Sequence, residues 1–208
     1  MADKRSRAAT DREEILDLLM TWGYSRDRGE WETLRNCFHT DGTIHIAWIS
    51  GTGYEFVDKS SKRLAEYKEG EYEKHVFSPP YIQLNGNRAI STIHVQHISR
   101  VIVDGREFDW DFWGQFHDLI EKREDGIWRL FRRTMVYERD RLDPVHPERM
   151  PEGYFDDIEF NAFRPPVRFL DWRLKKFGVQ AATSIVTINS VEESELIKNK
   201  IAWLRDAG

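Results

Sequence analysis

The sequence predicts an α+β fold in which helices come first and a long antiparallel sheet follows. Near the N-terminus, apolar residues recur at helical spacing, with Ile15, Leu19 and Trp22 on one stripe. From residue 75 onward the chain changes to long runs rich in β-branched and aromatic residues, separated by Asn-Gly or Asp-Gly pairs. Helices followed by consecutive strands are typical of α+β proteins.

Composition narrows the class of protein further. The chain has 208 residues, enough for one domain with an appendage and for a core that needs no disulfide or metal. A formal net charge of -5 argues against nucleic acid or an anionic membrane as the main partner. No apolar run is long enough to span a membrane and residues 1–10 are charged, so we expect a soluble, cytoplasmic protein. The single Cys37 excludes an internal disulfide and fits a small buried hydrophobe.

The first helix is expected to open at Thr10, because Thr10 and Glu13 have the spacing of a capping box. Beside its main buried stripe, which also includes Leu18, the helix carries a second stripe at helical spacing. That stripe consists of Leu16, Met20, Tyr24 and Asp27.

Three elements are expected between this helix and the sheet. A short helix follows Gly29, and Asp41-Gly42 predicts a turn into a strand over 43–49. Residues 58–73 are charged and favour a surface helix.

The sheet itself is expected to be a curved meander that wraps the helices on one side. Its strands are expected over 76–84, 88–103, 107–122 and 127–138. Between these strands, Asn85-Gly86, Asp104-Gly105 and Asp125-Gly126 supply the positive φ that tight hairpin turns require.

The C-terminal part differs in composition, and we divide the chain into residues 1–142 and 143–208. Five of the seven prolines lie in 143–168, which predicts an extended arm. Helices are expected over 167–177 and from Ser190, which forms a capping box with Glu193. This helical extension is too short to form a hydrophobic core by itself, so it should pack on the domain or on a partner subunit.

Asp27 is the first candidate for chemistry, because its helical position points a carboxylate along an apolar stripe. A carboxylate near a low-dielectric interior has a raised pKa unless it gains a partner, which is how a general base is made. The alternative is a solvated residue at the helix end beside Arg26 and Arg28.

Two of the seven histidines are candidates as well. His75 stands where the sheet begins and suits a proton shuttle. His97 shares strand parity with apolar residues and should face inward, either as a core residue or as a functional one, whereas His94 should face outward. His94 and His97 point to opposite faces, so a metal site is disfavoured.

Other side chains are candidates for binding a substrate. Trp113, with its neighbours Trp110, Phe112 and Phe116, suits ring stacking, although most of these rings must be core. Arg133 could clamp a carboxylate or phenolate, although a solvated arginine on a sheet face is commoner.

The arrangement resembles the nuclear-transport-factor-2-like superfamily, in particular its SnoaL-like (polyketide-cyclase-like) enzymes, over about residues 10–142. The residues that carry the resemblance are Tyr24-Ser25-Arg26-Asp27-Arg28-Gly29-Glu30-Trp31 leading to Phe38, Thr40-Asp41-Gly42, His75, Asn85-Gly86-Asn87-Arg88-Ala89, and Glu124-Asp125-Gly126-Ile127-Trp128-Arg129-Leu130.

The resemblance implies a cone-shaped sheet closed by helices around a deep hydrophobic pocket, in a homodimer or homotrimer. Several family members, among them scytalone dehydratase and hexachlorocyclohexane dehydrochlorinase, use an Asp near the end of the first helix and a His entering the sheet as a catalytic dyad. Asp27 and His75 match these two positions. Tyr24 could then hold a substrate oxygen, and His97 matches a second family histidine loosely.

These features lead us to expect a cofactor-independent lyase that eliminates water, halide or a small fragment such as formaldehyde from a hydrophobic aromatic molecule. Aromatic-compound catabolism is the expected setting. An isomerase or cyclase would use the same dyad and return the proton elsewhere. A ligand carrier, or a non-catalytic small subunit of a ring-hydroxylating dioxygenase, would need neither ionisable group.

Overall fold

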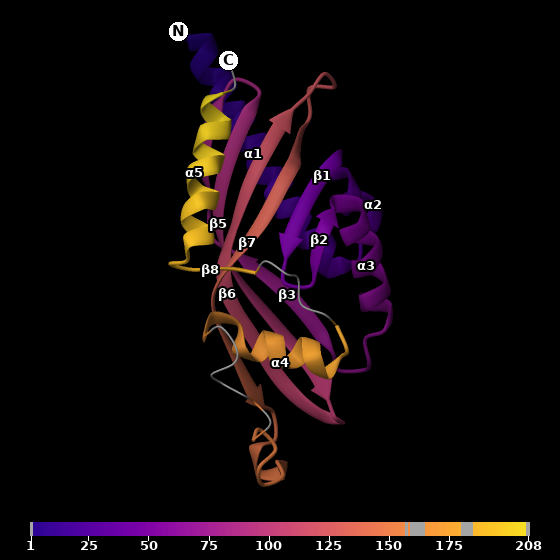
Figure 1. Cartoon of the computed structure of the whole chain (residues 1–208). Coiled ribbons are helices and arrows are strands. Elements are labelled where there is room, and N and C mark those ends of the chain that lie inside the picture. Colours follow the sequence, from indigo (N-terminus) through magenta and orange to yellow (C-terminus); the bar gives the residue numbers. More distant parts are fainter. Residues whose placement is uncertain (1, 157, 159–164, 180–184, 207–208) are drawn as a thin grey trace.

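The computed structural model describes residues 2–156, 158, 165–179 and 185–206, with side chains from residue 5 onward. Three helices precede the long strands, and two follow them (Figure 1). The helices are α1 (Ala2–Arg28), α2 (Trp31–Asn36), α3 (Gly53–Ala65), α4 (Arg168–Lys176) and α5 (Val191–Arg205), with short 3-10 turns at Pro147–Arg149 and Pro165–Val167. The strands are β1 (Phe38–Ile46), β2 (Ile49–Thr52), β3 (Tyr72–Phe77), β4 (Tyr81–Asn85), β5 (Arg88–Val103), β6 (Arg106–Lys122), β7 (Trp128–Pro144) and β8 (Val186–Thr187). The α+β class is confirmed.

One curved sheet carries the fold, in the order β2-β1-β7-β6-β5-β3, with β4 beside β5 and β8 beside β7. The meander β5-β6-β7 is antiparallel, as expected. The sheet as a whole is mixed, however, because β1 and β8 both pair with β7 in parallel. The predicted antiparallel sheet is thus confirmed for the meander, and the two parallel pairings are an addition that was not predicted. Parallel neighbours need a long connection, and β1 reaches β7 only through α3 and the whole meander.

The hairpin turns lie where the glycine pairs predicted them. Asp104 and Gly105 both have positive φ, 49° and 75°, and join β5 to β6. Gly86 at 57° and Gly126 at 73° occupy the turns on either side of that hairpin. The β4–β5 and β5–β6 turns contain two residues each, which fixes the register of these strands because such a turn leaves them one way to pair. The β6–β7 loop is longer and spans residues 123–127.

Helix α1 begins earlier than predicted. It starts at Ala2, and the Thr10 hydroxyl donates to the Ser6 carbonyl, one turn back, instead of capping a helix start. The main stripe is confirmed, since Ile15, Leu19 and Trp22 are buried in the core. The second stripe is not an apolar face of the core, because Leu16 and Tyr24 are exposed.

The segment between α2 and β3 also differs from prediction. Asp41-Gly42 lies inside β1, at the irregularity where the pairing of β1 with β7 shifts register. The charged helix begins at Gly53 instead of residue 58, because Thr52 and Glu55 form a reciprocal capping box. It ends at Ala65, and residues 72–77 form β3.

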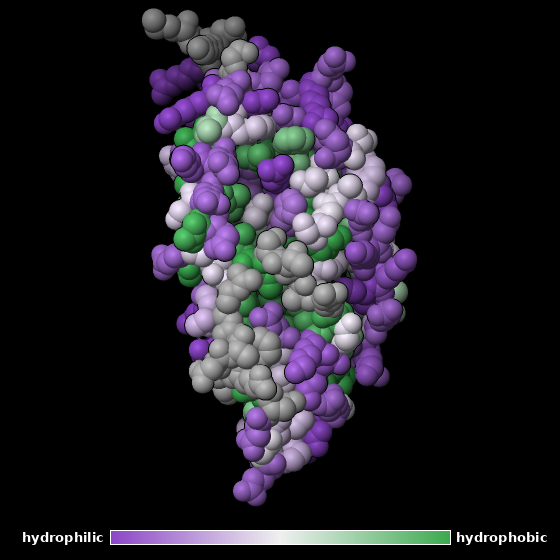
Figure 2. Space-filling view, viewed as in Figure 1, coloured by the Kyte–Doolittle hydropathy of each residue, from purple (hydrophilic) through white to green (hydrophobic). Residues whose placement is uncertain are grey.

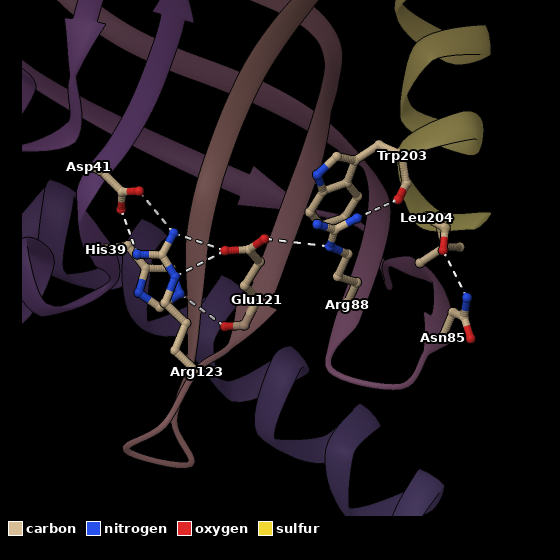
Figure 3. A network of polar contacts seen from close by, with 8 residues as sticks. All are labelled: His39, Asp41, Asn85, Arg88, Glu121, Arg123, Trp203 and Leu204. Carbon is tan, nitrogen blue, oxygen red and sulfur yellow. Dashed lines mark hydrogen bonds and ion pairs between the residues drawn. The ribbon is translucent and has the colours of Figure 1, made fainter. Parts of the chain in front are cut away.

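The C-terminal extension packs on its own domain. Figure 1 shows α4 lying across the long strands and α5 running along β5. Ser190 accepts the Glu193 N–H at the start of α5, as predicted. At the other end of α5, Arg88 and Asn85 donate to the carbonyls of Trp203 and Leu204 at 3.0 and 2.9 Å, and Figure 3 shows this contact continuing through Glu121. The boundary at residue 142 stays a prediction.

The surface is charged around a more apolar centre. Figure 2 shows hydrophobic residues gathered along the middle of the face in view, with hydrophilic residues around them. None of the helices in the described part of the chain is both long and apolar enough to cross a membrane.

Candidate active site

A cavity of about 290 Å³ lies between the helices and the inner face of the sheet. Helices α1, α3 and α4 and strands β3, β5, β6 and β7 contribute to its wall. Most of the wall is aromatic, with Trp22, Trp48, Phe56, Trp110, Phe112 and Phe116 among its residues. This volume and lining suit a small ligand of one or two rings.

Asp27 reaches this region from the last turn of α1. Gly23, one turn earlier, has the Phe77 ring packed where a side chain would stand, so the helix end lies directly on β3. The Asp27 side chain is only 12% exposed. Its Oδ1 lies 2.6 Å from His75 Nδ1, and its Oδ2 accepts the His75 backbone N–H at 2.8 Å. Asp27 therefore fixes both the position and the ring orientation of His75.

The His75 ring stands in the cavity wall, 9% exposed, edge-on to Trp22 at 5.8 Å between ring centroids. Because Nδ1–H is assigned as donating to Asp27, Nε2 carries the lone pair that a ligand can meet. A carboxylate on Nδ1 also stabilises the imidazolium that forms when Nε2 takes up a proton. The sequence-based pairing of Asp27 with His75 thus has the geometry that a general base requires.

A second histidine stands directly across the sheet from the first. His97 on β5 pairs in register with His75, and their rings are 4.8 Å apart. Its Nε2 lies 3.4 Å from Glu73 Oε2, and burial lowers the pKa of His97 to about 4 despite that hydrogen bond. His97 is therefore a neutral imidazole at pH 7. Its Nδ1 has no hydrogen-bond partner among the described residues.

Glu73 connects His97 to a buried cation. Arg26, one residue before Asp27, forms an ion pair with Glu73. Burial alone would raise the pKa of Glu73, but the His97 hydrogen bond and the Arg26 charge hold it well below its usual range. The site thus contains two groups of interacting side chains. One is Asp27 with His75, and the other is Arg26 with Glu73 and His97. Only in the first group is the histidine placed to act as a base.

Two tyrosines add hydroxyl groups to the wall. Tyr137 accepts the Ala47 N–H at 2.9 Å, and burial raises the pKa of Tyr137 above its usual value. Burial, together with the nearby Glu73, likewise raises the pKa of Tyr67. Both phenols keep their protons, so each is a potential hydrogen-bond donor.

The structure brings Asp27, His75 and His97 together but leaves three other predicted residues away from the cavity wall. Tyr24 is 60% exposed, with Arg28 over its ring at 5.9 Å. It follows the buried Trp22 by two residues, roughly 200° around the helix, and so lies on the opposite side of α1. Trp113 lies on the opposite face of β6 from Phe112, under the Arg139 guanidinium at 4.0 Å.

Arg133 is fully buried and forms a two-bond ion pair with Asp118, at 2.7 and 3.0 Å. Its guanidinium also stacks on Trp22 at 4.3 Å. Neither a solvated surface arginine nor a free carboxylate clamp describes this residue.

Sequence reasoning missed Glu73, Arg26 and Tyr137. A signal for the first was available, because Glu73 precedes His75 by two residues and must share its strand face. Arg26 follows Trp22 by four and so extends the buried stripe. Tyr137 gave no local signal, since its role depends on β1 folding beside β7.

No group of three His, Cys, Asp or Glu side chains within the described ranges could hold a metal ion. The predicted absence of a metal remains a prediction.

Comparison with known families assigns the chain to one of them. Residues 7–134 match the model of the SnoaL-like domain family. The chain belongs to the SnoaL-like family. Among curated proteins it is similar to pea pathogenicity protein 2 of Fusarium vanettenii, with 26% identity over 94% of this chain and 86% of that protein.

Solved structures with the same fold include two named as a dehydratase and a dehydrochlorinase. A putative scytalone dehydratase from Novosphingobium aromaticivorans has a TM-score of 0.56 at 20% identity, covering 68% of this chain and 91% of that one. A hexachlorocyclohexane dehydrochlorinase (LinA) also has a TM-score of 0.56, at 16% identity, covering 70% and 97%. At these identities the likeness shows the fold, which is the nuclear-transport-factor-2-like fold.

Proposed function

We propose that this SnoaL-like protein is a cofactor-independent acid-base lyase that acts on a small, hydrophobic, aromatic molecule. The observation that carries the proposal is the Asp27–His75 hydrogen bond of 2.6 Å in the wall of an aromatic cavity. A base in that position meets the three needs of an elimination: a lone pair facing the substrate, a carboxylate for the imidazolium that forms, and surroundings that exclude water.

In the proposed reaction His75 Nε2 removes a proton from a carbon next to a carbonyl or an aromatic ring. The electrons form a carbon–carbon double bond, and the group on the neighbouring carbon leaves. The leaving group is hydroxide, which is lost as water. Loss of formaldehyde instead starts at the O–H of a hydroxymethyl substituent: His75 takes that proton, the O–H electrons form the carbonyl of formaldehyde, and the electrons of the broken carbon–carbon bond form the double bond as hydroxide leaves the neighbouring carbon. Asp27 stabilises the imidazolium, which returns its proton to a departing hydroxide. Positioned acid-base groups of this kind contribute roughly 10² to 10⁴-fold each.

Charge that develops on a substrate oxygen needs a donor, and we assign that role to Tyr137 or Tyr67 in place of Tyr24. Both line the cavity and keep their protons. Neutral His97 has an unprotonated Nδ1 and can accept a hydrogen bond from a substrate hydroxyl. The names of the two solved relatives are those of enzymes that eliminate water or chloride, and this favours an elimination.

The test uses 3-hydroxy-1-tetralone, a two-ring hydroxyketone that loses water to give fluorescent 1-naphthol. We expect the wild type to form 1-naphthol above background and His75→Gln to fall to background. Asp27→Asn should lower kcat roughly 10² to 10⁴-fold. His94→Gln is the matched control, because His94 is an exposed histidine of β5 away from the cavity.

Turnover that survives in His75→Gln would contradict the proposal. Rearrangement of the tetralone without loss of water, dependent on the same two residues, would favour an isomerase instead.

A further inference from the structure

Helix α4 closes the cavity with one face. Leu170, Arg173, Leu174 and Phe177 recur at the spacing of a single helical stripe, and all four line the cavity. Asp140 on β7 accepts the Leu170 N–H at 2.7 Å and holds the start of α4 in place. This helix lies outside residues 7–134, which match the family model, so it adds a wall that the matched segment does not supply.

Arg173 on this stripe is unusual among the buried arginines. Arg26, Arg133 and Arg173 are each at least nine-tenths buried. Arg26 has Glu73 and Arg133 has Asp118 as counterions. The Arg173 guanidinium forms neither a hydrogen bond nor an ion pair within the described ranges, although only 7% of the residue is exposed. A buried charge without a partner is costly, so its retention calls for a function.

The surroundings of Arg173 strengthen this contrast. Its guanidinium lies 4.6 Å from the Trp110 ring centre, and Trp110 in turn lies 5.3 Å from the His97 ring. Burial and the neighbouring Arg63 lower the pKa of Arg173 to about 10, so it remains a cation at pH 7. Arg63 stands in the same wall, with no ion pair among the described residues, over Trp48 at 5.0 Å.

Of the three carboxylates in the cavity wall, Glu66 is exposed and the other two are already engaged. Glu73 is bound to Arg26 and His97. Glu71 accepts the backbone N–H groups of Ile102 and Lys68 at 2.8 and 2.9 Å. Two guanidinium groups therefore line an aromatic cavity without an ion-pair partner from the described chain.

We propose that Arg173, flanked by Arg63, binds a carboxylate group on the aromatic ligand of this cavity. The planar guanidinium fork matches a carboxylate with two hydrogen bonds, and the adjacent Trp110 offers a face for the ring. The inference rests on the proposed function for the aromatic class of the ligand. It adds that the substrate is an aromatic acid, anchored through α4 while its reactive carbon meets His75.

The experiment compares two probes of equal size, 2-naphthoate and the neutral 2-naphthamide, by isothermal titration calorimetry at pH 7 and low salt. We expect the wild type to bind the carboxylate at least tenfold more tightly than the amide. Arg173→Gln should remove this preference and leave the affinity for the amide unchanged, which also shows that the cavity is intact. Arg173→Lys should retain part of the preference, because charge without the fork is a weaker match.

Lys175→Gln is the matched control, because it removes one positive charge from the exposed side of the same helix. Equal affinities in the wild type, including no measurable binding of either probe, would overturn the inference. So would a preference that persists in Arg173→Gln.

Asp27→Asn separates this inference from the proposed function, since it should retain the preference for the carboxylate while losing turnover. If the protein prefers naphthoate but shows no turnover that depends on Asp27 and His75, the inferred anion site stands and the proposed lyase function is wrong. If turnover depends on these two residues but naphthoate is not preferred, the lyase function stands and the anion site is wrong.

Discussion

The two histidines that face each other across β3 and β5 differ because their partners differ. His75 meets Asp27 through the nitrogen remote from the cavity, at 2.6 Å. His97 meets a carboxylate whose charge is already shared with Arg26, and at the longer distance of 3.4 Å. Two imidazoles of the same cross-strand pair thus have separate chemistry, one available as a base and the other kept neutral.

We predict that His97 stays neutral from pH 8 down to about pH 5. Burial lowers its pKa from 6.5 to about 4. The unfolded chain therefore binds more protons between these values, and the stability that His97 contributes at neutral pH is lost as the pH falls from 6.5 through 4. Nitrogen-detected NMR of the histidine rings, assigned with His97→Gln, measures the midpoint. A His97 titration midpoint near 6.5 would contradict the prediction, because it would show that the ring is solvated and not buried in the cavity wall.

At the scale of single elements, α5 docks on the sheet through a buried lysine. Lys200 donates from Nζ to Thr92 Oγ1 at 2.6 Å and to His117 Nδ1 at 2.8 Å. The residue is only 7% exposed, and burial lowers the pKa of Lys200 to about 8. The lysine satisfies sheet groups that would otherwise be buried without partners.

Lys200→Ala should therefore destabilise the fold by about 2 to 4 kcal/mol, through lost packing and the unsatisfied polar groups left behind. Lys198→Ala removes an exposed lysine of the same helix and should change stability by less than about 0.5 kcal/mol. Urea unfolding measures both variants. Equal effects from the two substitutions would mean that α5 is not docked as the structure has it.

Local chemistry explains which elements could be predicted. The hairpins follow from Asp-Gly and Asn-Gly pairs, and α5 from the Ser190 cap, since each depends on a few neighbouring residues. The parallel pairing of β1 with β7 depends on segments about ninety residues apart, for example His45 with Thr134, and has no local signal. The early start of α1 was missed because a capping-box spacing at Thr10 does not require a helix to begin there.

For the site, too, local features could be predicted and contacts between distant segments could not. Asp27 and His75 came from resemblance together with helical and strand position, and the structure brings them together. Tyr24 was grouped with Asp27 by i, i+3 spacing, yet this spacing also crosses the edge of a buried face, and Tyr24 lies beyond that edge. Arg133 carried no sign of its partner, because Asp118 lies on the neighbouring strand.

At the scale of the whole molecule, the cavity is assembled from distant parts of the chain. Helix α1 supplies Asp27, β3 supplies His75, and the C-terminal extension supplies Arg173 through α4. The aromatic wall comes from both helices and strands. The extension is therefore part of the site and not a separate appendage. The predicted homodimer or homotrimer stays a prediction.

The central claim is that Asp27 and His75 move a proton inside this cavity. The most direct measurement follows exchange of the protons next to the carbonyl of 1-tetralone in deuterium oxide, by NMR, because this probe has no leaving group. We predict catalysed exchange in the wild type and in His94→Gln, exchange lowered roughly 10² to 10⁴-fold in Asp27→Asn, and background exchange in His75→Gln. Exchange at the wild-type rate in His75→Gln would contradict the account.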